Sequence, residues 1–207
     1  MYAQAIPRQM VRTADLVARI SPAHDQTAGA APGHALRTCV LVMRLAEAIG
    51  IGDRDRASLF YAALLHEASN ARDLVRKVGL SAEVESAITA LGERWDGRGA
   101  PYRLAGEAIP IFGRLLAVCH ALDATAAIRG PQHAMQMIHA RSGSWYDPAL
   151  TDVLLALCSH GLLAEAAATE REGTVGDLEP NWLARLAGAE EASDLSSAAA
   201  SPRHRQP

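Results

Sequence analysis

The 207-residue sequence has few aromatic side chains and few cysteines. Aromatic residues make up 4% of the chain, so aliphatic side chains must build most of the core that the 49% apolar content implies. The three cysteines, Cys39, Cys119 and Cys158, stand in apolar segments without C-x-x-C spacing. This pattern predicts buried thiols rather than disulfides or zinc ligands.

Charge and hydropathy argue against two classes of partner. The 20 Lys and Arg residues are balanced by 23 Asp and Glu residues, so the chain lacks the basic excess of a nucleic-acid-binding surface. No apolar run approaches the roughly 18 residues of a membrane helix. Residues 1–10 also lack the basic-then-apolar order of a signal peptide. We therefore expect a cytoplasmic protein that binds neither nucleic acid nor membrane.

Helical periodicity runs through most of the chain, and no segment alternates like a strand. Ala, Leu, Glu and Arg, all good helix formers, are abundant. We predict an all-α fold, a bundle of seven or eight helices. The predicted helices cover residues 8–20, 34–49, 53–67, 70–78, 81–91, 111–127, 131–141 and 147–169.

The pattern divides the chain into three parts. Residues 1–31 are expected to form an N-terminal helix and loop, residues 32–169 the helical domain, and residues 170–207 a C-terminal extension. After residue 189 the extension is rich in Ser and Ala and has one large apolar residue, Leu195. Such a composition cannot bury enough apolar surface to fold, which predicts disorder there.

Three histidines within apolar helical segments are the candidates for chemistry. His34 begins the segment 34–49, His66 precedes Glu67 at the end of 53–67, and His120 lies within 111–127. A buried polar group without a partner costs about 1–3 kcal/mol, and a shared divalent ion would satisfy all four side chains. Imidazole nitrogen and carboxylate oxygen suit Zn, Mn or Fe. We predict these four residues as metal ligands, with a site that holds no metal as the open alternative.

Each histidine also has a simpler interpretation. His34 is explained equally well as a surface residue at a helix start, after a polar loop. His66 and Glu67 are compatible with an exposed pair at a helix end. His120 is compatible with a hydrogen bond to a backbone carbonyl in the core. The other histidines are predicted to lie on the surface: His133, His139, His160 and His204.

A polar, glycine-rich loop with the sequence ERWDGRGAP occupies residues 93–101, between two helical segments. It resembles the signature loop of the HD-GYP family, metal-dependent phosphodiesterases that hydrolyse cyclic di-GMP. The family reads E-R-W-D-G-x-G-Y-P here, and Ala100 stands in place of the tyrosine. The residues that carry the resemblance are Glu93, Arg94, Trp95, Asp96, Gly97, Gly99 and Pro101.

The loop residues also have a structural interpretation. Trp95 and Pro101 are expected to hold the loop by packing, and Arg94 with Asp96 to form an ion pair. Gly97 and Gly99 would allow positive φ angles.

The resemblance extends over about residues 32–157 and implies an HD-type metal site. Such proteins place one histidine on an early helix, a His-Asp pair at the end of a later helix, and an aspartate after the signature loop. His34, the pair His66 and Glu67, and His120 occupy these positions.

Several positions depart from the family pattern. The family motif H-D-x-G-K becomes H-E-A-S-N, so that Glu67 replaces the aspartate and Asn70 the lysine. Leu91 and Gly92 replace the paired histidines before the signature loop, while Asp123 takes the position of a second acid. Asn70 and Asp123 are therefore accessory candidates.

The resemblance implies two possible functions. The favoured one is a degenerate HD-GYP-like signalling domain with weak or no cyclic di-GMP phosphodiesterase activity. It would act as a regulatory module on a cyclic dinucleotide or a signalling protein. The alternative is an active metal-dependent phosphohydrolase that uses the His/Glu site on cyclic di-GMP or another nucleotide. The first is favoured because losing a direct metal ligand costs more than the 10 to 100-fold of second-shell changes. No residue is assigned a catalytic role.

Overall fold

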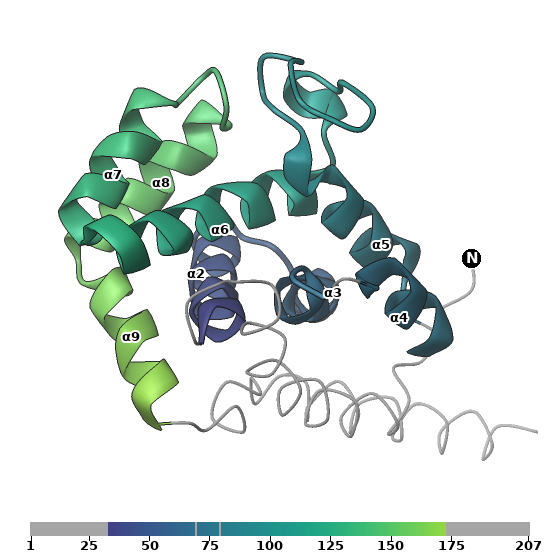
Figure 1. Ribbon diagram of the computed structural model, residues 1–207, viewed down its shortest axis with the longest axis horizontal. Helices are drawn as coiled ribbons and strands as arrows, with labels where there is room; N and C mark the ends of the chain where they lie inside the picture. The colour runs from purple at the N-terminus through teal and green to yellow at the C-terminus, as the bar shows by residue number, and fades with distance from the viewer. Residues whose placement is uncertain (1–32, 69, 79, 173–207) are drawn as a thin grey trace, which may run out of the picture.

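The computed structural model describes residues 33–172 except 69 and 79. The predicted helix 8–20 and the C-terminal extension after residue 172 lie outside the described residues, so these predictions and the domain boundaries stay predictions. The described part forms eight α-helices and contains no strand (Figure 1). The predicted all-α fold is confirmed.

Six of the predicted helices have ends within two residues of the observed ones. The α-helices are α2 (His34–Ala48), α3 (Asp53–Leu65), α4 (Ala71–Val78), α5 (Ala82–Thr89), α6 (Ile111–Arg129), α7 (Pro131–Ala140), α8 (Pro148–Ser159) and α9 (Leu162–Glu172). Two short 3-10 helices, Ala90–Gly92 and Gly106–Ala108, flank the signature loop. Pro131 and Pro148 stand in the first turns of α7 and α8. Backbone N–H groups there have no acceptor within the helix, so a proline loses no hydrogen bond.

The prediction of one helix over residues 147–169 is wrong. The chain forms α8 and α9 instead, and the two helices are bent by 74° at the break. Gly161, in the break, has a φ of +99°, which L side chains rarely adopt and which ends a helix. Leu154 on α8 and Leu162 and Ala166 on α9 are all buried, so apolar periodicity continues across the break and conceals it.

Helix α6 runs across the bundle and organises it (Figure 1). It packs against α2, α3, α5, α7 and α8, and α2 packs in turn on α3, α8 and α9. By length and composition α6 resembles a membrane span, but half of its most apolar window is buried inside the bundle. A core helix passes the same test, and the buried Leu115, Leu116 and Leu122 give α6 that role.

The three cysteines are buried free thiols, as predicted. Burial raises the pKa of Cys39 and Cys119, and it raises the pKa of Cys158 to about 11. The thiols therefore stay protonated at neutral pH and behave as small apolar side chains.

The signature loop begins where α5 comes very close to α6. A Cβ atom added at Gly113 of α6 would lie 2.6 Å from the Cβ of Ala90, in the 3-10 turn after α5. Real Cβ atoms do not approach so closely, so glycine is required for this contact. The contact places the start of the loop directly on the helix that carries His120.

We expect Gly113→Ala to destabilise the protein. Alanine favours a helix by about 1 kcal/mol, but overpacking costs about 1–3 kcal/mol. The melting temperature, followed by circular dichroism, should fall by about 2–4 °C for each net kcal/mol. Adding Ala90→Gly removes the clashing methyl group, so the double variant should lose less stability than the two single changes together. An unchanged melting temperature for Gly113→Ala would contradict this packing.

Candidate metal centre

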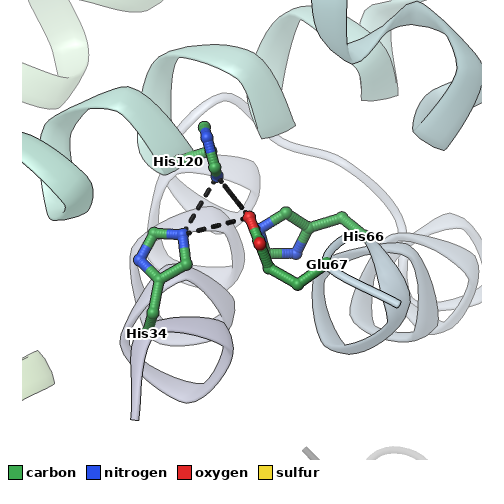
Figure 2. A group of neighbouring side chains, drawn as sticks. All are labelled: His34, His66, Glu67 and His120. Atoms are coloured by element: carbon green, nitrogen blue, oxygen red, sulfur yellow. Dashed lines mark hydrogen bonds and ion pairs between the residues drawn. The ribbon is translucent and has the colours of Figure 1, made fainter. Parts of the chain in front are cut away.

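Three helices that are distant in sequence bring four side chains to one point (Figure 2). His34 is the first residue of α2, and His120 lies in the middle of α6. His66 follows the last residue of α3, and Glu67 comes next. One ligand atom from each lies within 4.8 Å of the others. The structure thus gathers all four residues that the sequence predicts as metal ligands.

The spacing of these atoms suits a single small ion. His120 Nδ1 lies 3.0 Å from His34 Nε2 and 3.1 Å from His66 Nε2. Glu67 Oε1 lies 3.3 Å from His120 Nδ1 and 3.4 Å from His66 Nε2. It is 3.6 Å from His34 Nε2. Neighbouring ligands bound at about 2.0–2.1 Å to one ion stand about 2.8–3.4 Å apart in octahedral or tetrahedral geometry.

The outer nitrogen of His34 is held by a buried carboxylate. His34 Nδ1 donates to Asp123 Oδ2 at 2.7 Å. Arg37 binds the same carboxylate twice, from Nε to Oδ1 at 2.8 Å and from Nη2 to Oδ2 at 3.0 Å. A carboxylate on the outer nitrogen of a metal-binding histidine orients the ring and increases its basicity. Asp123, predicted as accessory, therefore acts on the centre through His34.

His66 is oriented in a similar way. Its Nδ1 donates to the carbonyl oxygen of Ala63, one turn earlier in α3, at 2.6 Å. The hydrogen bond directs Nε2 toward the cluster and leaves this atom without a proton in the neutral ring.

These tautomers leave the cluster short of positive charge. A neutral imidazole has one ring proton, and His34 and His66 both use theirs outside the cluster. Their Nε2 lone pairs face the Glu67 carboxylate, and His120 can contribute at most one proton through Nδ1. Four acceptor atoms that share one proton repel one another in a low-dielectric interior. The arrangement therefore requires either a metal ion or additional protons.

In the metal-free protein, protons supply this charge. Burial lowers the pKa of His34, but hydrogen bonds with Asp123 and Glu67 outweigh it and raise the pKa to about 9. Hydrogen bonds from His34 and His66 hold the pKa of Glu67 far below its usual range. Burial and the neighbouring imidazoles lower the pKa of His120 to about 4. At neutral pH, His34 is thus protonated beside an ionised Glu67 and a neutral His120.

The donor set fits a divalent transition metal. Three imidazole nitrogens and one carboxylate oxygen suit Zn, Mn or Fe, the ions expected from the sequence. Within the described residues, this is the one group of three or more His, Cys, Asp or Glu side chains that could hold an ion. The described part of the chain therefore offers donors for a single ion.

The simpler interpretations of the histidines do not match the structure. His34 is 2% exposed and is not a surface residue. His66 is also buried, so it does not form an exposed pair with Glu67. His120 directs Nδ1 toward the other two imidazoles rather than toward a backbone carbonyl.

Other candidates lie apart from the cluster. Asn70 is exposed just before α4, and its accessory role stays a prediction. The predicted surface position is confirmed for His133, His139 and His160, while His204 lies outside the described residues.

Glu93 holds the signature loop in shape. Its buried carboxylate accepts hydrogen bonds from the backbone N–H groups of Tyr102 at 2.6 Å and Leu104 at 3.0 Å. Trp95 is half-buried, and its ring lies 5.7 Å from the guanidinium carbon of Arg114, in agreement with a packing role.

The centre of the loop is held by an ion pair and by a close backbone approach. Arg94 Nη2 lies 2.5 Å from Asp96 Oδ2, as predicted. Gly97 has a φ of +76°, also as predicted. Gly99 serves a different purpose, because an added Cβ would lie 2.3 Å from the backbone nitrogen of Arg94. Pro101 is exposed, so the prediction that it packs to hold the loop is wrong.

The sequence reasoning missed Arg37. A signal was present, because His34 and Arg37 are separated by three residues, as are His120 and Asp123. This spacing puts each pair on one helix face. It becomes meaningful only once α2 is known to pack against α6.

Known proteins resemble this chain over the segment that carries most of the centre. Residues 65–150 match the HD domain family, a span that includes His66, Glu67, the signature loop and His120. Over 109 residues the chain is 35% identical to the 3'3'-cGAMP-specific phosphodiesterase 3 of Vibrio cholerae. This match covers 52% of the chain and 24% of the relative. The matched segment is an HD domain. With the E-R-W-D-G loop, these matches support membership in the HD-GYP family.

Two further relatives agree with this assignment. A cyclic di-GMP phosphodiesterase of Vibrio cholerae is 39% identical over 71 residues, which are 31% of this chain and 14% of that protein. The cyclic di-GMP phosphodiesterase response regulator RpfG of Xanthomonas campestris is 39% identical over 69 residues, 30% of this chain and 18% of the relative. The chain thus matches about a quarter or less of each of these curated relatives.

A solved structure has the same fold. The crystal structure of a cyclic GMP-AMP specific phosphodiesterase of Vibrio cholerae superposes with a TM-score of 0.72 at 22% identity. The superposition covers 77% of this chain and 52% of the other. At this level of identity the likeness establishes the HD-domain helical fold alone.

We expect Asp123→Asn to weaken metal binding by about 10 to 100-fold, the usual effect of removing a carboxylate behind a metal-binding histidine. The amide keeps the size of the side chain but loses the charge that faces His34 and Arg37. Competition with a chromophoric chelator measures the affinity. Asp152→Asn, an exposed change on α8, is the matched control. Equal affinities for both variants would show that Asp123 does not support the centre.

Metal binding by this chain should release a proton. Because the pKa of His34 is raised to about 9, an incoming ion must displace the His34 proton at any pH below that value. Apparent affinity should therefore rise by up to about tenfold per pH unit between pH 6.5 and 8.5 and level off near pH 9. Calorimetry in two buffers with different ionisation enthalpies counts the released protons. An affinity that does not change with pH would contradict the charge state described here.

Proposed function

We propose that this chain is a regulatory HD-GYP domain that binds a cyclic dinucleotide beside a single-metal centre and hydrolyses it weakly or not at all. One observation carries the proposal. Among the described residues, His34, His66, Glu67 and His120 form the one group of side chains that could hold a metal ion. No comparable group is present for a second ion in this part of the chain. The domain keeps the scaffold of a phosphodiesterase without the donors of a two-metal site.

The ligand class comes from the relatives. Two of them are named for cyclic di-GMP and one for 3'3'-cGAMP. The matched segment includes His66, Glu67, the signature loop and His120 in the family comparison, so the shared sequence spans the centre. A cyclic dinucleotide is therefore the ligand class that the relatives favour.

The same residues disfavour turnover. Two-metal hydrolysis needs two ions about 3.5–4 Å apart, one for the attacking and one for the leaving oxygen. Leu91 and Gly92, directly before the signature loop, carry no donor side chains. His34 and His66 have both ring nitrogens engaged, at the cluster and outside it, so neither is available to transfer a proton to substrate.

A bound divalent ion would supply Lewis-acid polarisation of a phosphoryl oxygen. The chain itself holds and orients the side chains that would bind the ion. Asp123 and Ala63 fix two imidazoles, and Glu67 balances their charge. These roles support binding without requiring a chemical step.

A second candidate function is an active metal-dependent phosphohydrolase that uses the same centre. One observation favours it: the His120 side chain is 30% exposed and borders a groove, so a bound substrate would lie next to the centre.

Binding and turnover of purified protein separate the two functions. With one equivalent of Zn, Mn or Fe, we expect cyclic di-GMP or 3'3'-cGAMP to bind in calorimetry, and chromatography to show less than one turnover per chain. Multiple turnovers that His66→Ala abolishes, and that the exposed control His139→Ala leaves intact, would establish the enzyme instead. Absence of binding for both nucleotides would remove cyclic dinucleotides from the function.

A further inference from the structure

A groove of about 550 Å³ lies on α6, between the signature loop and the turn that joins α7 to α8. Its volume is within the range of about 300–1,000 Å³ that is usual for small-molecule sites. The floor is built from small side chains of α6, Ala117, Ala121, Ala124 and Thr125. These lie on the same helix face as His120, which also lines the groove. The groove therefore exists because α6 carries small residues there, and it reaches the metal centre.

The walls of the groove carry positive charge. Arg94, Arg98 and Arg141 all line it. Arg94 is neutralised by Asp96. Asp96 also lies near Arg98 and accepts its backbone N–H. Its one negative charge stands against three guanidinium groups, so the walls of the groove keep an excess of positive charge.

The one acidic side chain in the lining forms no ion pair with these arginines. The carboxylate of Glu93 is turned into the loop, where it accepts the N–H groups of Tyr102 and Leu104. Within the part of the chain that the structure describes, the groove thus presents guanidinium groups and no available carboxylate.

Trp145 holds Arg141 in place. The guanidinium carbon of Arg141 lies 4.4 Å from the centroid of the Trp145 ring, and that of Arg94 lies 4.2 Å from it. The carbonyl of Arg141 also accepts the N–H groups of Ser144 and Trp145, which closes the turn. Stacking on an aromatic ring and a tight turn reduce the entropy that an arginine loses when it binds an anion.

We propose that this groove binds the two phosphodiester groups of a cyclic dinucleotide through Arg98 and Arg141, with Trp145 as the residue that positions Arg141. The proposal rests on the proposed function, which supplies the ligand class. Arg94, Arg98 and Arg141 outnumber the Asp96 carboxylate, and this excess of positive charge suits the two negative charges of the ligand. The planar guanidinium fork suits phosphate oxygens, and the flat alanine floor leaves room for the nucleoside.

The assignment also explains how the chain manages without two family residues. Asn70 and Ala100 stand where the resemblance implies a lysine and a tyrosine, so neither can bind a phosphate in the family manner. Arg98 in the signature loop and Arg141 after α7 supply positive charge from other elements. The phosphate-binding charge has moved from the helix end at Asn70 to the opposite walls of the groove.

Charge-removing variants test the proposal in the metal-loaded full chain. Arg98→Gln and Arg141→Gln should each weaken binding of cyclic di-GMP or 3'3'-cGAMP by about tenfold or more, and the double variant by about 100-fold. Arg72→Gln, an exposed change on α4, is the matched control and should bind like the wild type. Trp145→Leu should weaken binding in the presence of Arg141 and have little further effect in Arg141→Gln.

Filling the groove is an independent test that leaves the charges intact. Ala124→Leu adds volume to the floor and should weaken binding, whereas Ala127→Leu, on an exposed part of α6 outside the lining, should not. Melting temperature and metal stoichiometry show that each variant is folded and loaded.

The outcomes separate the two proposals. If the wild type binds a cyclic dinucleotide and the arginine and Ala124 variants bind equally well, the groove assignment is overturned and the proposed function stands. Wild-type protein that binds neither nucleotide would overturn the proposed function itself. Inorganic phosphate, added as a competitor, should displace the nucleotide only at far higher concentration. Displacement at similar concentrations would overturn recognition of two linked phosphates.

Discussion

The buried carboxylate of Asp123 is the contact on which the centre depends. It accepts hydrogen bonds from His34 and two from Arg37, and so joins α2 to α6 in the middle of the bundle. A buried charge costs free energy unless its partners satisfy it, and here a guanidinium and an imidazole do so. The contact turns the His34 lone pair toward Glu67 and His120. The need for a metal ion or additional protons at the centre follows from this orientation together with that of His66.

The sequence was sufficient for six of the described helices and for the four converging residues. Helical periodicity is a local property, and Gly and Pro mark most of the boundaries, as Pro131 does for α7. The four residues could be found because His and Glu are conspicuous in apolar helices and because the loop resembles a known family. Arg37 could not be found in this way, since its partner lies 86 residues away and the pair has meaning only when α2 packs on α6.

The remaining misses have the same physical origin. The break at Gly161 depends on one positive φ angle, while the buried residues on either side keep a continuous apolar pattern. Pro101 was expected to pack against the loop but is exposed, which depends on the path of the loop rather than on its composition. The groove on α6 could not be predicted from the sequence either. It lies over the small side chains of Ala121 and Ala124, and its walls come from segments that are distant in sequence.

Glu67 and His120 relate the metal centre to the groove. The Glu67 oxygen approaches all three imidazoles, so the longer side chain is placed to bind an ion together with them. His120 directs Nδ1 to that ion while its exposed side lines the groove. A ligand in the groove and an ion at the centre therefore share one side chain. If the ion holds His120 in the position that the groove ligand prefers, the ion increases the affinity for that ligand. The ligand then increases the affinity for the ion by the same factor, because coupling between two sites is reciprocal. Under the proposed function, the metal would then set the affinity of the domain for the nucleotide.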